Sequence, residues 1–399
     1  MARSSFRTKL VLVAGVSVAA GLLLSGGAAY VGIQRLGADA AEETQRGLRY
    51  ASTEYLDKHI DNVAQHLSIE LDRAEAELAT FAAIQQQIID HQEELQPVLD
   101  AAAKAPMLKD NLVFDPKGQW SQTGDAEPTT VTAWGYLHEP PEAEGEARAI
   151  REDVAQAIDD TALMDLLMPA IGRHGSRKLQ IYYVGPKERA FARFFPAVPL
   201  AQTLDEKDPG HNGEVFWDHF FPSLVEGWTS WVGHKERFED LARQITFLSP
   251  YDDAAGGGPI ITLFQPLWSA DRTRFAGALG FDLTLTGIID YVEEVKLFES
   301  GFAFLAQDNG NVFAISERGS RTLGLSTTSS EGGGVSRYDQ FLGKSSEAAI
   351  RDLKLPEGEA AESREIVLGG HNYVLELKRL APFNVWGGTD EITEARWVV

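Results

Sequence analysis

The sequence predicts an α+β protein with an N-terminal transmembrane helix, a long stalk helix and two mixed α/β subdomains in tandem. Three observations lead to this prediction. Residues 10–33 carry no charge. Apolar residues then recur at spacings of three and four from Leu56 to Phe81, which is the pattern of one helix face. After Gln96, β-branched and aromatic runs alternate with turn residues and amphipathic segments, which is typical of mixed α/β units.

Composition limits the classes of function. A chain of 399 residues exceeds one ordinary core, so two domains and an extension are expected. The net charge of -23 argues against a nucleic-acid partner, because phosphate binding requires a clustered basic surface. The absence of cysteine excludes a disulfide framework and a thiolate metal site.

The charge-free segment 10–33 is long enough to span a membrane as a helix. Arg3, Arg7 and Lys9 precede it, so residues 1–9 are predicted to be cytoplasmic and the rest to lie outside. The alternative is a cleaved signal peptide, although the apolar segment is long for one. Both interpretations export the body of the chain, and the first places it on the cell inner membrane as a single-pass protein with its sensor domain in the periplasm or outside the cell.

Residues 34–95 are predicted to form the stalk helix. Its apolar positions run from Leu56 through Leu71 to Phe81 and then Ile84 or Gln85, with charged residues and glutamines on the other faces. One interpretation packs this stripe on the helix's own domain, and the other makes the stalk a dimeric coiled coil. A mixture is favoured, in which the early half forms a homodimer and the later half packs on the domain.

The remaining chain is divided into a membrane-distal subdomain at 96–285 and a membrane-proximal subdomain at 286–386. Predicted strands of the first include Leu179–Val184, Ile260–Phe264 and Phe275–Leu283. The second begins with a helix at 286–298 and contains an Asn-Gly hairpin at 308–311. Residues 387–399 carry no second apolar span, so this tail is interpreted as the altered end of a longer receptor or as the end of a single-span sensor acting through a partner.

Aromatic residues are dense between residues 217 and 231, at Trp217, Phe220, Phe221, Trp228 and Trp231. Dense aromatics line ligand pockets, and they also close cores under loops. For any single one of them, the core is the simpler explanation.

Two motifs carry a family resemblance. A Pro-Tyr-x-Asp turn ends at Asp253, and a Gly-x-Asp-φ-Thr strand contains Asp282. With the stretches 220–228 and 301–314, they resemble the double Cache sensor domains of bacterial receptors, namely histidine kinases, chemoreceptors, cyclases and serine phosphatases. The resemblance covers about Arg35 to Trp386. It implies two PAS-like subdomains and a small-molecule pocket in the distal one.

The resemblance also implies site residues. The family's Tyr-x-Asp pair and later strand aspartate correspond to Tyr251, Asp253 and Asp282, and two carboxylates with a phenol suit a cationic amine. The family's Arg-x-Trp-Tyr element, which holds an amino-acid carboxylate, has only the partial equivalent 215–218. The predicted ligand-binding residues are therefore Tyr251, Asp253, Asp282, Trp217, Tyr183 and Arg193.

Simpler explanations exist for these residues. Asp253 could do no more than bond the backbone of its own turn. Asp282 shares a strand face with Gly280 and Thr284, because successive side chains alternate, and that face could be exposed to solvent. Arg193 could be an ordinary surface arginine.

Motifs of common enzymes are absent from the sequence: there is no phosphate-binding glycine loop, nucleophile elbow or His-Glu-x-x-His. We therefore expect no catalytic activity, no cofactor and no metal. The predicted function is an extracytoplasmic sensor of a small polar or cationic solute that signals through the stalk helix. The alternative is a ligand-free interaction or structural module, and an exported hydrolase is a weaker third.

Overall fold

The computed structural model describes residues 43, 47, 50–51, 54–103, 112–115, 119–122, 129–134, 138–139, 149–173, 178–207, 210–211, 215–220, 224–229, 245–253, 258–295, 297, 301–326, 340–358, 361–386 and 392–399. They fall into two units, Met1–His59 and Ile60–Val399. The predicted transmembrane segment 10–33 lies outside the described residues. Within them, no helix is both long and apolar enough to cross a membrane.

The described part of the first unit is helical at 54–59. Lys58 donates a hydrogen bond from Nζ to Glu54 Oε1 at 2.8 Å, and the rings of Tyr55 and His59 lie 4.4 Å apart. Both contacts join residues four apart, which are neighbours on a helix surface.

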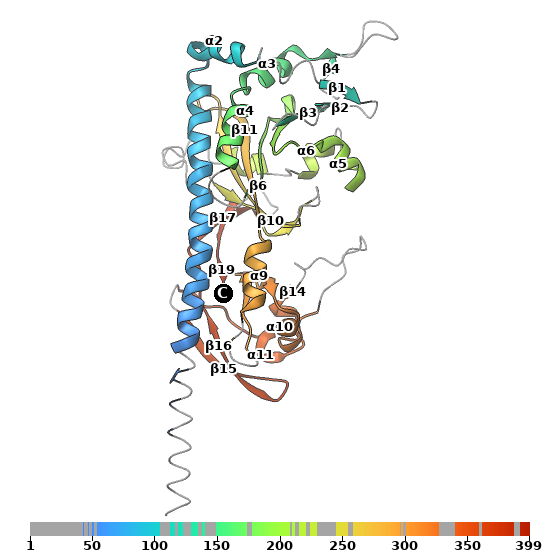
Figure 1. Cartoon of the computed structure of the whole chain (residues 1–399). Coiled ribbons are helices and arrows are strands. Elements are labelled where there is room, and N and C mark those ends of the chain that lie inside the picture. Colours follow the sequence, from blue (N-terminus) through green and yellow to red (C-terminus); the bar gives the residue numbers. More distant parts are fainter. Residues whose placement is uncertain are drawn as a thin grey trace, which may run out of the picture. The chain divides into compact units, whose positions relative to one another are not determined.

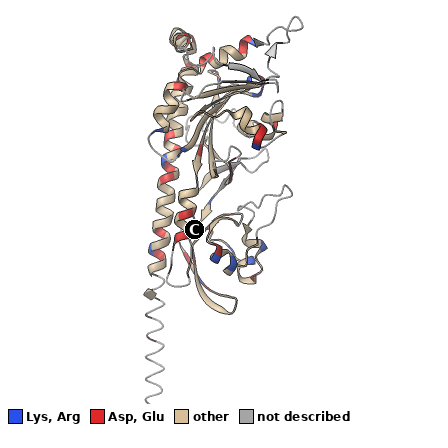
Figure 2. Cartoon of the chain, turned by 45° about the vertical axis from the view of Figure 1, so that its right-hand side comes forward, with Lys and Arg blue, Asp and Glu red and all other residues tan. Residues whose placement is uncertain are grey.

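The second unit begins with a helix over 60–90. The predicted apolar stripe is buried from Ile60 to Phe81, and it packs in the same core as the main sheet. Figure 1 shows this helix running alongside the sheet. The stripe continues through Gln85, which is buried, whereas Ile84 is exposed. This part of the helix therefore packs on its own domain. Acidic residues recur along the helix (Figure 2).

The main sheet follows the order β1-β2-β3-β7-β6-β11-β10-β8-β17-β18, with β9 paired to β10. Its central pairs are antiparallel, whereas β17 pairs with β8 in parallel. The strands are β1 Leu112–Asp115, β2 Gln119–Gln122, β3 Thr130–Trp134, β6 Lys178–Val184, β7 Phe191–Phe195, β8 Thr246–Phe247, β9 Tyr251–Asp252, β10 Pro259–Trp268, β11 Phe275–Thr284, β17 Phe383–Trp386 and β18 Ile392–Ala395.

Short helices accompany this sheet, and two further strands, β4 His138–Glu139 and β5 Ala149–Ile150, pair with each other. The helices are α2 Gln92–Ala103, α3 Glu152–Asp160, α4 Met164–Gly172, η2 Lys187–Arg189, α5 Leu200–Lys207, α6 Phe216–Phe220 and α7 Leu224–Thr229.

A second, smaller sheet has the order β14-β13-β12-β19. Its core is a separate cluster that includes Phe304, Val312 and Leu342. The elements are α9 Thr286–Glu294, β12 Phe304–Gln307, β13 Asn311–Ile315, α10 Glu317–Thr322, β14 Gln340–Phe341, η5 Leu342–Lys344, α11 Ala348–Arg351, β19 Trp397–Val398 and the hairpin β15 Glu362–Leu368 with β16 His371–Leu377.

The C-terminal residues join both sheets. Strand β18 extends the main sheet through β17, and β19 pairs with β12 of the smaller one. Trp397 is buried, and its ring lies 4.8 Å from that of Phe313. The described part of the predicted tail is thus built into the fold.

The hairpin of β10 and β11 is tied to the long helix by its turn. Gln86 accepts a hydrogen bond from the Trp268 backbone N–H at 2.9 Å and donates one to the Trp268 carbonyl at 2.8 Å. Arg272 donates two hydrogen bonds to Asp90, at 2.5 and 2.7 Å. These contacts fix the two longest strands against the helix, and the predicted mixed α/β architecture with a long N-terminal helix is confirmed.

Candidate functional site

Asp282 lies near the C-terminal end of β11, flanked by the apolar residues Phe281 and Leu283. Phe281 contacts the long helix, where its ring lies 6.5 Å from that of Phe81. Because side chains alternate along a strand, Asp282 lies on the other face of the sheet. It pairs with Thr262 of β10 on one side and with Gln180 of β6 on the other. Asp282 is buried, so the interpretation that it faces solvent is wrong.

Hydroxyl groups surround this carboxylate. Asp282 Oδ1 accepts a hydrogen bond from Thr262 Oγ1 at 2.6 Å and one from the Tyr182 hydroxyl at 3.1 Å. Thr262 has a single hydroxyl proton and donates it to Asp282, so the Tyr251 hydroxyl, 2.7 Å from Thr262 Oγ1, is the donor in that pair. Tyr251 and Asp282, predicted as one site, are therefore joined through Thr262.

Among the described residues, no cation forms an ion pair with Asp282 or contributes to the shift of its pKa. The pKa of the Asp282 carboxyl is raised to about 7, chiefly by burial and also by the nearby Asp253 carboxylate, although the hydrogen bonds from Thr262 and Tyr182 act in the lowering direction. Among the described residues, hydrogen bonds reach Oδ1 only. The second oxygen, Oδ2, receives no hydrogen bond from a described residue, and a positive charge or a hydrogen-bond donor would be a suitable partner for it.

The same carboxylates act on the neighbouring phenols. Burial raises the pKa of the Tyr182 and Tyr251 hydroxyls well above their usual value, and the charge of Asp282 raises both further. Each phenol consequently remains a neutral hydrogen-bond donor at physiological pH. The cluster therefore offers one carboxylate held by neutral hydroxyls.

Gly280 makes room for Tyr182. A Cβ atom at Gly280 would lie 2.4 Å from the Tyr182 ring, which is closer than any real contact. The Tyr182 ring stacks on Phe194 at 5.1 Å and meets the edge of Phe264 at 5.8 Å. Trp228 continues this aromatic wall through Phe264 at 6.2 Å. One side of the Asp282 cluster, which we define as Asp282, Thr262, Tyr182 and Tyr251, is therefore apolar and aromatic.

Tyr183 and Arg193 do not join the Asp282 cluster. Tyr183 pairs with Leu279, so it lies on the sheet face that contacts the helix, and its hydroxyl donates to the Ala276 carbonyl at 2.8 Å. Arg193 pairs with Tyr183 across β6 and β7 and shares that face. Trp217 lies on α6 and is buried in the main core.

Arg193 is fully buried, so its interpretation as a surface residue is wrong. Its Nη1 lies 2.6 Å from Asp165, and its Nη2 donates to the Ile158 carbonyl at 2.8 Å. Asp165 also accepts from Thr129 Oγ1 at 2.7 Å. Burial is tolerated here because each charge meets an opposite charge and further hydrogen bonds.

Asp253 keeps both of its possible roles. Its backbone N–H donates to the Gly258 carbonyl at 2.9 Å, so the turn is closed by the main chain, and the predicted bond from the Asp253 side chain to this backbone stays a prediction. Its carboxylate also acts electrostatically on Asp282 and Tyr251. Asp253 therefore influences the Asp282 cluster through its charge, without a hydrogen bond to Asp282 or Tyr251 among the described contacts.

Sequence reasoning missed Tyr182 and Thr262. Both face the same side as Asp282, and strand alternation carried the signal: Tyr182 pairs with Gly280, two positions before Asp282, and Thr262 pairs with Asp282 itself. Which of Tyr182 and Tyr183 lies on the face of Asp282 depends on the register of β6 against β11, and this register cannot be read from the sequence.

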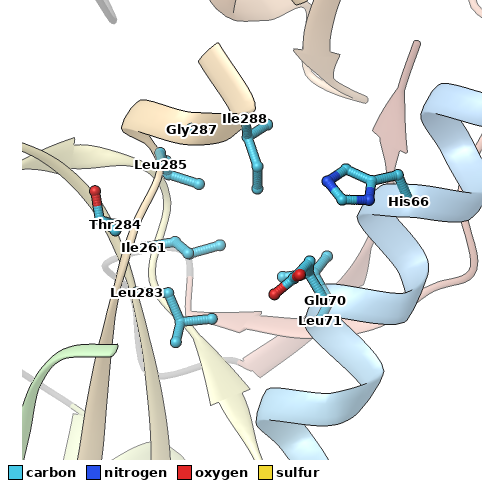
Figure 3. A pocket seen from close by; sticks show the side chains of 9 residues that line it. All are labelled: His66, Glu70, Leu71, Ile261, Leu283, Thr284, Leu285, Gly287 and Ile288. Atoms are coloured by element: carbon cyan, nitrogen blue, oxygen red, sulfur yellow. The ribbon is translucent and has the colours of Figure 1, made fainter. Parts of the chain in front are cut away.

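A small cavity lies between the long helix and the start of α9 (Figure 3). His66, Glu70 and Leu71 of the helix line one side, and Ile261 and Leu283 are among the residues of the other. Its volume of about 40 Å³ accommodates roughly one water molecule and no metabolite. A larger cavity, of about 280 Å³, lies at the turn of the β10–β11 hairpin.

Comparison with known proteins gives partial matches, and no family model matches the chain. The methyl-accepting chemotaxis protein McpC of Bacillus subtilis is 35% identical over 71 residues, which are 18% of this chain and about a tenth (10%) of McpC's length. This match confirms the predicted resemblance to sensors of bacterial receptors.

Two solved structures are also similar. The ligand-binding domain of the Pseudomonas aeruginosa chemoreceptor PctC, with GABA, is 15% identical at a TM-score of 0.32, covering 82% of this chain and 98% of its own. That of the Pseudomonas fluorescens chemoreceptor CtaA, with L-isoleucine, is 13% identical at a TM-score of 0.37, covering 89% and 94%.

Proposed function

We propose that this chain is the extracytoplasmic sensor module of a bacterial signal-transduction receptor and that it binds a small polar or cationic solute at the Asp282 cluster. The main support is a buried carboxylate whose described neighbours are hydroxyls and a second carboxylate, with no cation among them. Leaving a charge unpaired in a protein interior is costly. A cationic ligand would supply the missing charge.

The aromatic wall supports the same class of ligand. Tyr182, Phe194 and Phe264 stand beside the carboxylate, and an ammonium group is attracted both to a carboxylate and to aromatic faces. A small amine, or a solute with several hydroxyl groups, therefore suits the site. This ligand class follows from the residues present.

The remaining parts of the proposal rest on the sequence and on the chemotaxis-protein match. The charge-free segment 10–33 after Arg3, Arg7 and Lys9 supports an inner-membrane anchor with the sensor outside. The partial match to McpC supports a receptor role. We propose that two PAS-like subdomains form the sensor, at 96–285 and 286–386, with β17 of the second range contributing to the main sheet. We also propose that the output is not catalysis within this chain. Ligand binding would signal through the stalk, whose early half forms a homodimer.

The test is a thermal-shift screen of the purified chain against small amines and polyols. A ligand at 100 times its Kd adds about 2.7 kcal/mol to the free energy of unfolding. Asp282→Asn should abolish the shift, and Tyr182→Phe should reduce it. Asp352→Asn, a matched change at an exposed position, should leave the shift intact.

The pH dependence sharpens the test. A permanently charged probe such as choline requires an ionised Asp282, whose pKa is about 7 in the free chain. Its affinity should rise about tenfold per pH unit below pH 7 and become constant above it. A thermal shift that persists in the Asp282→Asn variant would show that the ligand does not bind at the Asp282 cluster. No shift with any compound would favour the ligand-free interaction module.

A further inference from the structure

We propose that the cavity at the turn of the β10–β11 hairpin is a second ligand site, separate from the Asp282 cluster, for a small organic anion that carries a hydrogen-bond donor. The cavity measures about 280 Å³, close to the roughly 300 Å³ at which small-molecule sites begin. It is lined from the long helix, α3, η2 and the hairpin.

A buried polar atom without a partner points to a ligand. Gln85 lines the cavity and is only 2% exposed. No described residue donates a hydrogen bond to its Oε1 atom. Buried acceptors are rarely left unsatisfied, because desolvation then goes uncompensated. A hydroxyl or ammonium group of a ligand would satisfy this oxygen.

Charge in the lining favours an anion. Arg189 and Arg274 line the cavity together with one acidic residue, Asp160. The Asp160 carboxylate already accepts hydrogen bonds from Gln92 at 2.7 Å and from Gln156 at 2.8 Å. The charged side chains of the lining are thus two arginines and one carboxylate, a formal charge of +1 in a chain of net charge -23. Guanidinium groups bind carboxylates well.

The site is independent of the Asp282 cluster. Tyr183 lines this cavity and pairs with Leu279, whereas Tyr182 pairs with Gly280 on the face of Asp282. The two sites therefore lie on opposite faces of β6 and β11. They also require opposite charges of their ligands. If no ligand binds at one of the two sites, the proposal for the other site is unaffected.

A ligand here would join the long helix to the hairpin. Gln85 comes from the helix, while Ser269 and Arg274 come from the turn. The same turn is already held to the helix by the Arg272–Asp90 ion pair. Occupancy of the cavity would add to this attachment, so the bound anion would modulate how firmly the sheet is held to the helix.

The experiment titrates the full purified chain with L-lactate and with propionate, which lacks the hydroxyl group, at equal ionic strength. Isothermal titration should give a Kd for L-lactate about tenfold lower than for propionate, the value of one hydrogen bond. Gln85→Leu should remove this preference. Arg189→Gln should weaken both anions at least tenfold, whereas Arg173→Gln, at an exposed position, should change neither.

Asp282→Asn provides the second control, because it should leave the lactate affinity unchanged while it abolishes choline binding. Absence of lactate binding, or equal Kd values for lactate and propionate, would overturn the proposal. So would a preference for lactate that persists in Gln85→Leu. Arg189 is partly exposed, so its variant is expected to fold and keeps the test decisive even where Gln85→Leu does not fold.

Discussion

Two buried aspartates on this sheet and its helices differ in what surrounds them. Asp165 is 5% exposed and Asp282 is 4% exposed, so both have lost nearly all contact with water. Asp165 meets the guanidinium of Arg193 at 2.6 Å. Asp282 meets only hydroxyls and a second carboxylate among the described residues.

Charge compensation distinguishes a structural buried charge from a candidate functional one. The Arg193–Asp165 pair is closed, because each charge already has its opposite and further hydrogen bonds. The Asp282 carboxylate is open, and burial raises its pKa to about 7. Perturbed groups of this second kind concentrate at binding sites. Four predictions test this contrast, from the largest effect to the smallest.

Opening the closed pair should have the largest effect. Asp165→Asn keeps the size of the side chain but leaves the Arg193 guanidinium buried without its counter-charge. We expect a loss of about 3–5 kcal/mol in the free energy of unfolding, measured by urea denaturation. The double variant Asp165→Leu with Arg193→Met should recover most of it. A loss below about 1 kcal/mol in the single variant would show that the pair is not what makes burial tolerable.

The open carboxylate should make stability depend on pH. The folded chain keeps a proton on Asp282 up to about pH 7, whereas the unfolded chain releases it near pH 4. The free energy of unfolding of the wild type should therefore fall relative to Asp282→Asn by about 1.4 kcal/mol per pH unit between these values. Burial also raises the pKa of Glu75 to about 7, but that residue acts equally in both chains. Parallel pH curves would contradict an open carboxylate.

Gly280 tests the geometry of the Asp282 cluster. Gly280→Ala places a Cβ atom 2.4 Å from the Tyr182 ring, which must then move away from Asp282. We expect a loss of about 1–3 kcal/mol in stability, as for an overpacked core, and weaker binding of any ligand that depends on Asp282. Gly343→Ala is the matched control, since its Cβ atom meets nothing within 4 Å. Equal melting temperatures of the two variants would show that Tyr182 is free to relax.

The ion pair at the hairpin turn should have the smallest effect. The Arg272 and Asp90 side chains are 35% and 19% exposed, and hydrogen bonds from Arg272 lower the pKa of the Asp90 carboxyl. Because solvent screens such pairs, Asp90→Asn should reduce stability by about 1 kcal/mol or less. Glu317→Gln, which breaks the exposed Arg321–Glu317 pair, should cost nothing measurable in thermal denaturation. If Asp90→Asn lowered the free energy of unfolding as much as Asp165→Asn does, the Arg272–Asp90 pair would be as important for stability as the buried Arg193–Asp165 pair, contrary to this prediction.

Much of the fold could be predicted, because helices and strands produce periodic patterns among residues that are close together in the sequence. The helical stripe from Ile60 to Phe81, the strands β6 and β11 and the hairpin turn at 308–311 follow from residue type and spacing alone. The resemblance also brought Tyr251 and Asp282 into one site, and the structure links them through Thr262. Tyr182 and Thr262 were missed because their places depend on strand register.

Residue type and spacing along the chain are enough to predict which segments are helix or strand and that an acidic residue interrupts an apolar strand. Whether a given charge is compensated depends on the folded arrangement. Arg193 and Asp165 are 28 residues apart, and Tyr182 and Asp282 are 100 apart. The pairing of such distant residues depends on strand order and on which face each side chain occupies. The physical reason is that charge compensation is a property of distances in space, whereas hydrophobic periodicity is a property of neighbours along the chain.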